Sequence, residues 1–222
     1  MNMKKIISFF IVACCAMCAT AAKVVWQIGV ADNSGTELAL GPSEYKKFLA
    51  HDFGYEDRYF LVGTSVDKND FPYVLPGPDD TWGGTWSTSG WRTHDANILF
   101  GIKKLPKHGK WKLVVDLVDA NPSRSVVKVM VNSAEKKFEI KGHSKGVLEG
   151  NLQDAKEQIL EFPISADDLK KGGNMVTVSV LEGGWIVFDQ IRLEGADELV
   201  LEKNNEYAFL RNVAPAEYEM EM

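Results

Sequence analysis

Apolar and polar residues alternate along much of the chain after residue 97, with the period of two that a β-strand requires. In the clearest case, Leu113, Val115 and Leu117 would lie on one face of a strand, with Lys112 and Asp116 on the other. Such segments and short apolar runs, separated by Gly, Pro, Asn and Ser turns, predict strands at 24–28, 37–40, 59–63, 97–102, 111–118, 126–131, 136–140, 158–164, 175–181 and 185–193. This many short strands with only token helices predict an all-β protein, an antiparallel β-sandwich of the jelly-roll type.

Two departures from the strand pattern add detail. Helix signals are limited to the segment 42–49 and to a single turn at 165–169. In the strand at 185–193, the apolar residues change from one face to the other in its middle. This change of face predicts a β-bulge near Asp189 and Gln190.

The stretch 71–97 fits neither a helical period nor strand alternation and is therefore expected to be a long loop. Its proline, glycine and tryptophan content indicates an ordered, functional loop, because disordered segments lack large apolar groups. Indole rings beside mixed polar side chains suit a sugar ring, which has an apolar C–H face and a polar rim. The predicted carbohydrate-binding residues are Trp82, Trp86, Trp91, Arg92, His94 and Asp95. The alternative is that the tryptophans close one end of the β core.

The N-terminus has the pattern of a secretory signal peptide. Lys4 and Lys5 precede an apolar run that is too short to span a bilayer, and an Ala-Thr-Ala cleavage pattern follows at 19–21. We therefore expect residues 1–22 to be removed and the protein to be secreted or periplasmic, without membrane insertion. The apolar run also resembles a bacterial lipobox, so a lipid anchor at Cys14 on the cell surface is the alternative.

All three cysteines lie inside this predicted signal peptide, so the mature chain would have no disulfide and no thiolate metal site. An exported protein without disulfides indicates a bacterial origin. The formal net charge is −6, and no basic patch of the kind that binds nucleic acid is evident. After Gly195 the strand pattern weakens, so residues 23–195 are expected to form one domain and 196–222 a linker or the start of a following domain.

No catalytic or metal-binding set stands out. The four histidines are scattered without zinc-ligand spacing, and no nucleophile elbow or phosphate-binding loop is present. With 31 acidic residues, no single carboxylate pair can be assigned to glycoside hydrolysis. No cofactor is expected, although loop carboxylates leave a structural Ca²⁺ open, with Asp79, Asp80 and Asp119 as candidate ligands.

Several short motifs occur in the order found in one known domain. They are VWQIG at 25–29, DFPY at 70–73 with PGP at 76–78, WR at 91–92, and GN at 173–174 leading to FDQIRL at 188–193. Together they resemble the carbohydrate-binding-like third domain of rhamnogalacturonan lyases, polysaccharide lyase family 4, over roughly residues 24–195. The resemblance implies a jelly roll of the galactose-binding-like type that accompanies enzymes degrading plant cell-wall or host glycans. In that family the lyase chemistry belongs to a separate domain, which nothing in this chain matches.

Three functions remain open on this evidence. The favoured one is a secreted, non-catalytic carbohydrate-binding module of a polysaccharide-degrading system, with an oligosaccharide or polysaccharide as its partner and a catalytic domain C-terminal to it. The second is a fragment of a polysaccharide lyase or glycoside hydrolase whose active site lies elsewhere. The third is a structural β-sandwich module that braces a neighbouring domain.

Overall fold

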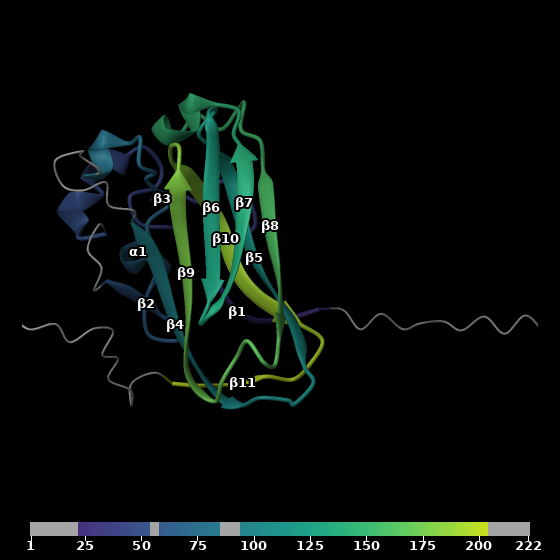
Figure 1. Ribbon diagram of the computed structural model, residues 1–222. Helices are drawn as coiled ribbons and strands as arrows, with labels where there is room; N and C mark the ends of the chain where they lie inside the picture. The colour runs from purple at the N-terminus through teal and green to yellow at the C-terminus, as the bar shows by residue number, and fades with distance from the viewer. Residues whose placement is uncertain (1–21, 54–57, 85–93, 204–222) are drawn as a thin grey trace, which may run out of the picture.

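The computed structural model describes residues 22–53, 58–84 and 94–203, which form two β-sheets packed face to face (Figure 1). The first sheet has the order β1-β10-β5-β8, with the short β3 paired to β10. The second has the order β11-β4-β9-β6-β7, with β2 paired to β4. The predicted β-sandwich is therefore confirmed.

The strand bounds follow the predicted segments closely. The first sheet contains β1 (Lys23–Gly29), β3 (Val74–Leu75), β5 (Lys110–Ala120), β8 (Gln158–Ser165) and β10 (Ile186–Gly195). The second contains β2 (Tyr59–Leu61), β4 (Asp95–Lys104), β6 (Arg124–Val131), β7 (Ala134–Lys141), β9 (Gly172–Glu182) and β11 (Val200–Glu202). All pairings are antiparallel except that of β2 with β4.

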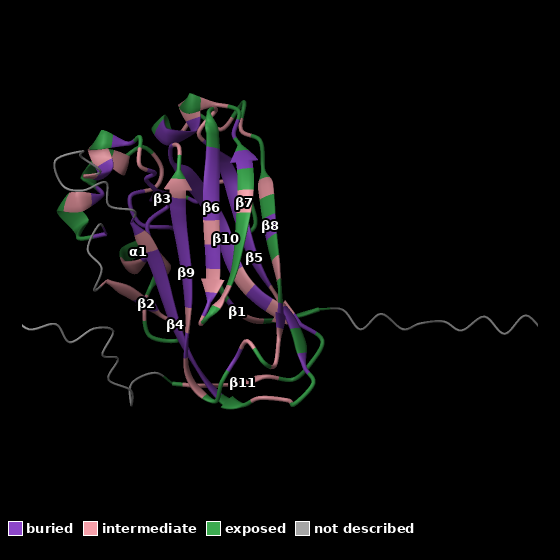
Figure 2. Ribbon diagram, viewed as in Figure 1, coloured by how far each residue is buried: buried purple, intermediate pink, exposed green. Residues whose placement is uncertain are grey.

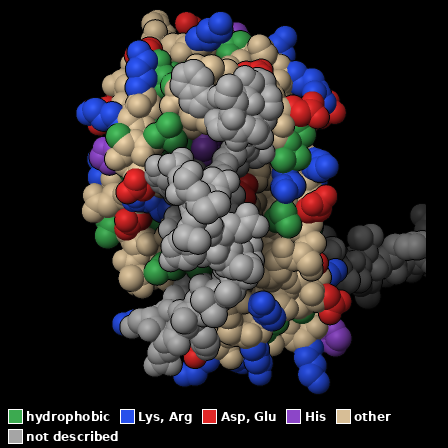
Figure 3. Space-filling view, turned by 60° about the vertical axis from the view of Figure 1, so that its left-hand side comes forward, with side chains coloured by type: hydrophobic (Ala, Val, Ile, Leu, Met, Phe, Trp, Pro, Cys, Tyr) green, Lys and Arg blue, Asp and Glu red, His purple; other side chains and the backbone are tan. Residues whose placement is uncertain are grey.

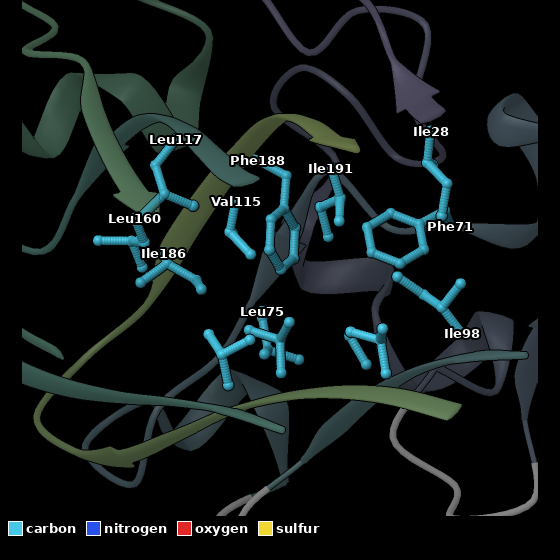
Figure 4. Close-up of a cluster of buried hydrophobic side chains, with 14 of the residues drawn as sticks. Ile28, Phe71, Leu75, Ile98, Val115, Leu117, Leu160, Ile186, Phe188 and Ile191 are labelled. Carbon is cyan, nitrogen blue, oxygen red and sulfur yellow. The ribbon is translucent and has the colours of Figure 1, made fainter. Parts of the chain in front are cut away.

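The core lies between the sheets and is filled by the inward residues of each strand (Figure 4). Phe188 of β10 is fully buried and packs against Phe71, with ring centroids 5.2 Å apart. Phe71 in turn contacts Phe60 of β2 at 5.8 Å. A loop aromatic thus joins the two sheets at the centre of the core, where such rings contribute much of the buried apolar area.

Burial differs between central and edge strands (Figure 2). Strands β5 and β10 are buried along nearly their whole length, whereas β7 and β8 alternate with exposed residues. The edge strand β7 has the sequence AEKKFEIK, and such charged side chains disfavour pairing with another chain. Asp116 lies on the face of β5 opposite to Leu113 and Leu117, as predicted, and only 3% of it is exposed.

The predicted bulge is confirmed. The pairing of β10 with β5 shifts between Val187 and Phe188 and again between Phe188 and Gln190, and the second shift spans Asp189. This irregularity turns Asp189 toward the loop after β1, where its Oδ1 accepts a hydrogen bond from the Ser34 backbone N–H at 3.0 Å. The bulge therefore serves to connect the N-terminal loop to the centre of the first sheet.

Three local predictions were wrong. The segment 37–40 forms only an isolated bridge between Ala39 and Pro72, because Leu40 has a φ of 65° that no strand can continue. The segment 42–49 folds as two 3₁₀ turns, η1 (Tyr45–Lys47) and η2 (Leu49–His51). The segment 165–169 is a turn without a helix.

The described helices are all short. They are α1 (Asp67–Asp70) and the 3₁₀ turns η1, η2, η3 (Thr81–Gly83) and η5 (Lys145–Glu149). Among the described residues, no helix is long and apolar enough to cross a membrane.

Candidate functional site

Aromatic side chains from three separate segments meet near η1, η2 and η3. We call this group the aromatic end and define it as Tyr45, Phe48, Phe53, Trp82 and His94. Phe48 is at its centre, fully buried, with its ring 5.9 Å from Phe53, 6.2 Å from Trp82 and 5.5 Å from His94. Tyr45 comes from η1 and Trp82 from η3, and Phe48 lies between η1 and η2.

Trp82 is half-buried and is held from several sides. The Tyr45 ring meets the indole edge-on at 4.9 Å, and Phe48 meets it at nearly a right angle. Asp80 forms a side-chain hydrogen bond with Trp82, for which the indole N–H is the donor. The orientation of the ring is thus fixed by the cluster below it, while part of its surface stays accessible to a ligand.

Asp80 is a buried carboxylate beside this indole, with 8% of its surface exposed. Its Oδ2 accepts a hydrogen bond from the Gly77 backbone N–H at 2.8 Å. Burial raises the pKa of Asp80 to about 6, although the hydrogen bond from Gly77 lowers it in part. This acid therefore titrates close to neutral pH and changes charge directly beside Trp82.

His94 and Asp95 are adjacent in sequence but serve different parts of the structure. His94 is 6% exposed, packs on Phe48, and forms a ring-nitrogen hydrogen bond with the Gly83 carbonyl. Asp95 lies opposite Ser179 in the sheet and accepts a hydrogen bond from the Ser179 hydroxyl. His94 thus braces the loop that carries Trp82, whereas Asp95 is bonded to a neighbouring strand of the sheet.

Of the six predicted carbohydrate-binding residues, the structure places Trp82 and His94 in one cluster and Asp95 outside it. Trp86, Trp91 and Arg92 lie outside the described residues and stay predictions. Sequence reasoning missed Tyr45 and Phe48, which support Trp82. The only local signal was their spacing of three residues in the segment expected to be helical.

The candidate calcium ligands do not converge. Asp119 is fully buried, and its two oxygens accept hydrogen bonds from the backbone N–H groups of Ala120, His143 and Ser144 at 2.8–3.0 Å. This carboxylate therefore anchors the loop after β7. Within the described ranges, no group of three or more His, Cys, Asp or Glu side chains could hold a metal ion.

A second set of acids lies on the outer face of the first sheet. Burial, reinforced by the negative charges of Glu157 and Asp189, raises the pKa of Asp116 to about 6 against the opposing effect of Arg192. Arg192 Nη1 lies 3.7 Å from Asp116 Oδ2 and is the cation that partly offsets this repulsion.

Comparison with known families and structures places this fold in context. The profile of the family described as "CBM-like: Polysaccharide lyase family 4, domain III" matches residues 24–193. No curated protein matches the chain.

Similar solved structures include modules and domains of carbohydrate-active proteins. The family GH115 4-O-methyl-α-glucuronidase BtGH115A, with specificity for decorated arabinogalactans, matches at 16% identity and a TM-score of 0.34, over 48% of this chain and 14% of that one. The CBM35 of Abf62 from Cellvibrio japonicus matches at 12% identity and a TM-score of 0.35, over 50% of this chain and 70% of that one. Xyl-CBM35 in complex with a glucuronic acid-containing disaccharide matches at 12% identity and a TM-score of 0.33, over 50% of this chain and 71% of that one.

Proposed function

The chain belongs to the CBM-like family of polysaccharide lyase family 4 domain III, and we propose that it binds carbohydrate through the aromatic end. The observation that carries this proposal is the half-buried Trp82 ring, held by Tyr45, Phe48 and Asp80. A ring fixed before binding loses little conformational entropy when a sugar stacks on it. The aromatic end thus offers a preorganised platform for the apolar face of a sugar.

Polar groups around Tyr45 suit the hydroxyls of such a sugar. The Tyr45 hydroxyl donates to Glu149 Oε1 at 3.1 Å, and Lys46 Nζ lies 5.5 Å from the centre of the Tyr45 ring. A carboxylate, a phenol and an ammonium group therefore border the platform, and all three can exchange hydrogen bonds with hydroxyls. Trp86, Trp91 and Arg92 remain candidates for further contacts.

In this proposal the module is non-catalytic and is exported from a bacterial cell by cleavage near residue 22, with lipid attachment at Cys14 as the alternative. Its ligand is a plant pectic or host glycan, and its partner is a catalytic domain of a polysaccharide-degrading enzyme. The match of residues 24–193 to the CBM-like domain family supports this assignment. A purely structural sandwich is the competing function, and the packing of His94 within the aromatic end is what favours it.

The test is intrinsic tryptophan fluorescence of the protein during titration with pectic and host-type oligosaccharides. We expect a saturable spectral change that is lost in Trp82→Ala, because that indole is the platform. Trp26→Phe is the matched control, since Trp26 is a core indole that packs on Phe100. Trp86→Ala and Trp91→Ala measure the contribution of the remaining tryptophans.

Two results would contradict the proposal. A spectral change that persists in Trp82→Ala with an intact fold, judged by circular dichroism, would move the site away from the aromatic end. No response to any glycan, with Trp82 protected from a soluble quencher, would favour the structural module.

A further inference from the structure

A cavity of about 560 Å³ lies beside the second sheet, where β9 begins. We call it the β9 cavity. Its walls come from Tyr59 of β2, the β6–β7 turn at 132–133, the loop 167–170 and the first residues of β9 at 173–175. Its volume falls in the range of sites for small ligands, roughly 300–1,000 Å³.

This cavity is separate from the aromatic end. Met175, in its wall, pairs with Leu99 of β4, whereas Asp95 at the other end of β4 pairs with Ser179. The separation of four residue steps corresponds to roughly 13 Å along the strand. Trp82 lies beyond Asp95 and His94, so one sugar ring cannot occupy both places.

Two amide side chains, the half-buried Asn132 and the buried Asn174, hold the cavity walls in place. The Asn132 Nδ2 donates to Asn174 Oδ1 at 2.9 Å and to the Asp168 carbonyl at 2.8 Å, and Asn132 Oδ1 accepts from the Met175 backbone N–H. Asn174, 1% exposed, donates to the carbonyls of Lys170 and Gly172 and accepts from the Lys170 backbone N–H. These hydrogen bonds tie three chain segments together, so the cavity is formed before any ligand arrives.

The lining combines apolar and polar surfaces. The Tyr59 ring, the Met175 thioether and the Leu169 side chain supply apolar area. Ser133, Asp167 and Lys170 are exposed, and their side chains form no hydrogen bond or ion pair within the part of the chain described. An aromatic and aliphatic floor with a rim of available donors and acceptors matches a ring that has one apolar face and several hydroxyls.

The charge of the lining selects among such rings. Asp167 and Asp168 outnumber Lys170, so the lining carries a net negative charge that disfavours a ligand carboxylate. Lys and Arg side chains are spread around the outline of the face seen in Figure 3, with acidic side chains among them. Among those near the end of β4, Lys104 is paired with Glu198 at 3.5 Å, and neither residue lines the cavity.

We propose that the β9 cavity is a second carbohydrate subsite, which binds a neutral sugar ring. The ring stacks its C–H face on Tyr59 and Met175, and its hydroxyls bind Ser133, Asp167 and Lys170. Only the ligand class rests on the carbohydrate binding proposed above. The site itself rests on the cavity and its amide framework.

The test uses the full chain labelled with [methyl-¹³C]methionine and followed by NMR. Met175 lines the cavity, whereas Met130 lies on the neighbouring strand outside its lining; Met175→Leu and Met130→Leu assign the two signals. We titrate with galactose, arabinose and rhamnose as neutral sugars, and with galacturonate and glucuronate as charged ones. We expect saturable shifts at Met175 with a neutral sugar, smaller shifts at Met130, and weaker binding of the uronates.

Variants at the rim locate the ligand. Lys170→Ala should weaken neutral-sugar binding about tenfold, because a charged hydrogen bond to the ligand is lost. Lys171→Ala is the matched control, since Lys171 is exposed and does not line the cavity. Trp82→Ala should leave the Met175 titration unchanged.

Three outcomes would overturn the inference. They are no shift at Met175 with any neutral sugar, tighter binding of a uronate than of every neutral sugar, and a Met175 response that disappears in Trp82→Ala. A fluorescence response at Trp82 without a Met175 response would contradict this inference and leave the aromatic-end proposal intact. A Met175 response without the fluorescence change would contradict the aromatic-end proposal and leave the β9 cavity as the binding site.

Discussion

The aromatic end and the β9 cavity are both built from loops at the border of the second sheet, but different forces hold them. At the aromatic end, Phe48 joins Phe53, Trp82 and His94 by ring packing. At the β9 cavity, Asn132 and Asn174 join the turns by directional hydrogen bonds. Packing depends on volume and tolerates similar shapes, whereas a buried hydrogen-bond network fails when one partner is removed. Substitutions should therefore affect the two sites in different ways.

The largest effect is expected at the centre of the aromatic end. Phe48→Ala removes a fully buried ring that touches three other aromatic side chains. We expect the free energy of unfolding to fall by about 3–5 kcal/mol, as for other buried Phe→Ala changes. Denaturant unfolding followed by circular dichroism measures the loss.

Phe48→Leu is the control for this prediction. It keeps most of the apolar volume and should cost less than half as much, while Trp82 fluorescence shifts because its supporting ring is gone. Equal losses in both variants would mean that the ring geometry, and not its volume, stabilises the aromatic end.

The next largest effect is expected at the β9 cavity. Asn174→Ala leaves the Lys170 N–H, the carbonyls of Lys170 and Gly172, and Asn132 without their shared partner. Buried groups that lose their partner cost about 1–3 kcal/mol each, and we expect a total loss of about 2–4 kcal/mol because water reaches some of them. Neutral-sugar shifts at Met175 should vanish, while Trp82 fluorescence should not change.

Asn151→Ala is the matched control, because this exposed asparagine accepts only a local hydrogen bond from the Gln153 N–H. Its effect on unfolding should stay within about 0.5 kcal/mol. A loss at Asn174 no larger than at Asn151 would show that the amide network does not hold the cavity.

The difference between the two sites also explains what the sequence could predict. Alternation at residues such as Leu113 and Val115 revealed the sheets, since burial of one strand face has a local period of two. The bulge at Asp189 was visible for the same reason. The turn at 165–169 was mistaken for a helix because Asp168 Oδ2 accepts from both the N–H and the hydroxyl of Ser165, a turn interaction that resembles helix capping in sequence.

The sites themselves were only partly predictable. Trp82 was identified because its loop is rich in proline, glycine and tryptophan. It packs on Phe48, however, which lies 34 positions away in the sequence. The contact between Asn132 and Asn174 spans 42 positions. Neither contact leaves a periodic signal, so the partners become evident only once the strands have been paired.

The last of these effects depends on pH and arises from Asp80, the buried acid at the aromatic end. The folded pKa of Asp80 is raised to about 6 from an unfolded value near 3.8. Between these values the folded state binds more protons than the unfolded state, so stability falls as pH rises from about 4 to 6 and then levels off. We expect the Asp80 contribution to be roughly 3 kcal/mol over this range.

Asp80→Asn should abolish this contribution and raise stability relative to wild type above pH 6, because a neutral amide still accepts the Gly77 N–H. Trp82 fluorescence should titrate near pH 6 in the wild type and become flat in the variant. Asp116→Asn is the control, because Asp116 titrates in the same range but lies on the first sheet, and it should leave the fluorescence titration intact. A Trp82 titration that survives in Asp80→Asn and disappears in Asp116→Asn would show that the responsible acid is Asp116 and not Asp80. The aromatic end would then have no pH response of its own that distinguishes it from the β9 cavity.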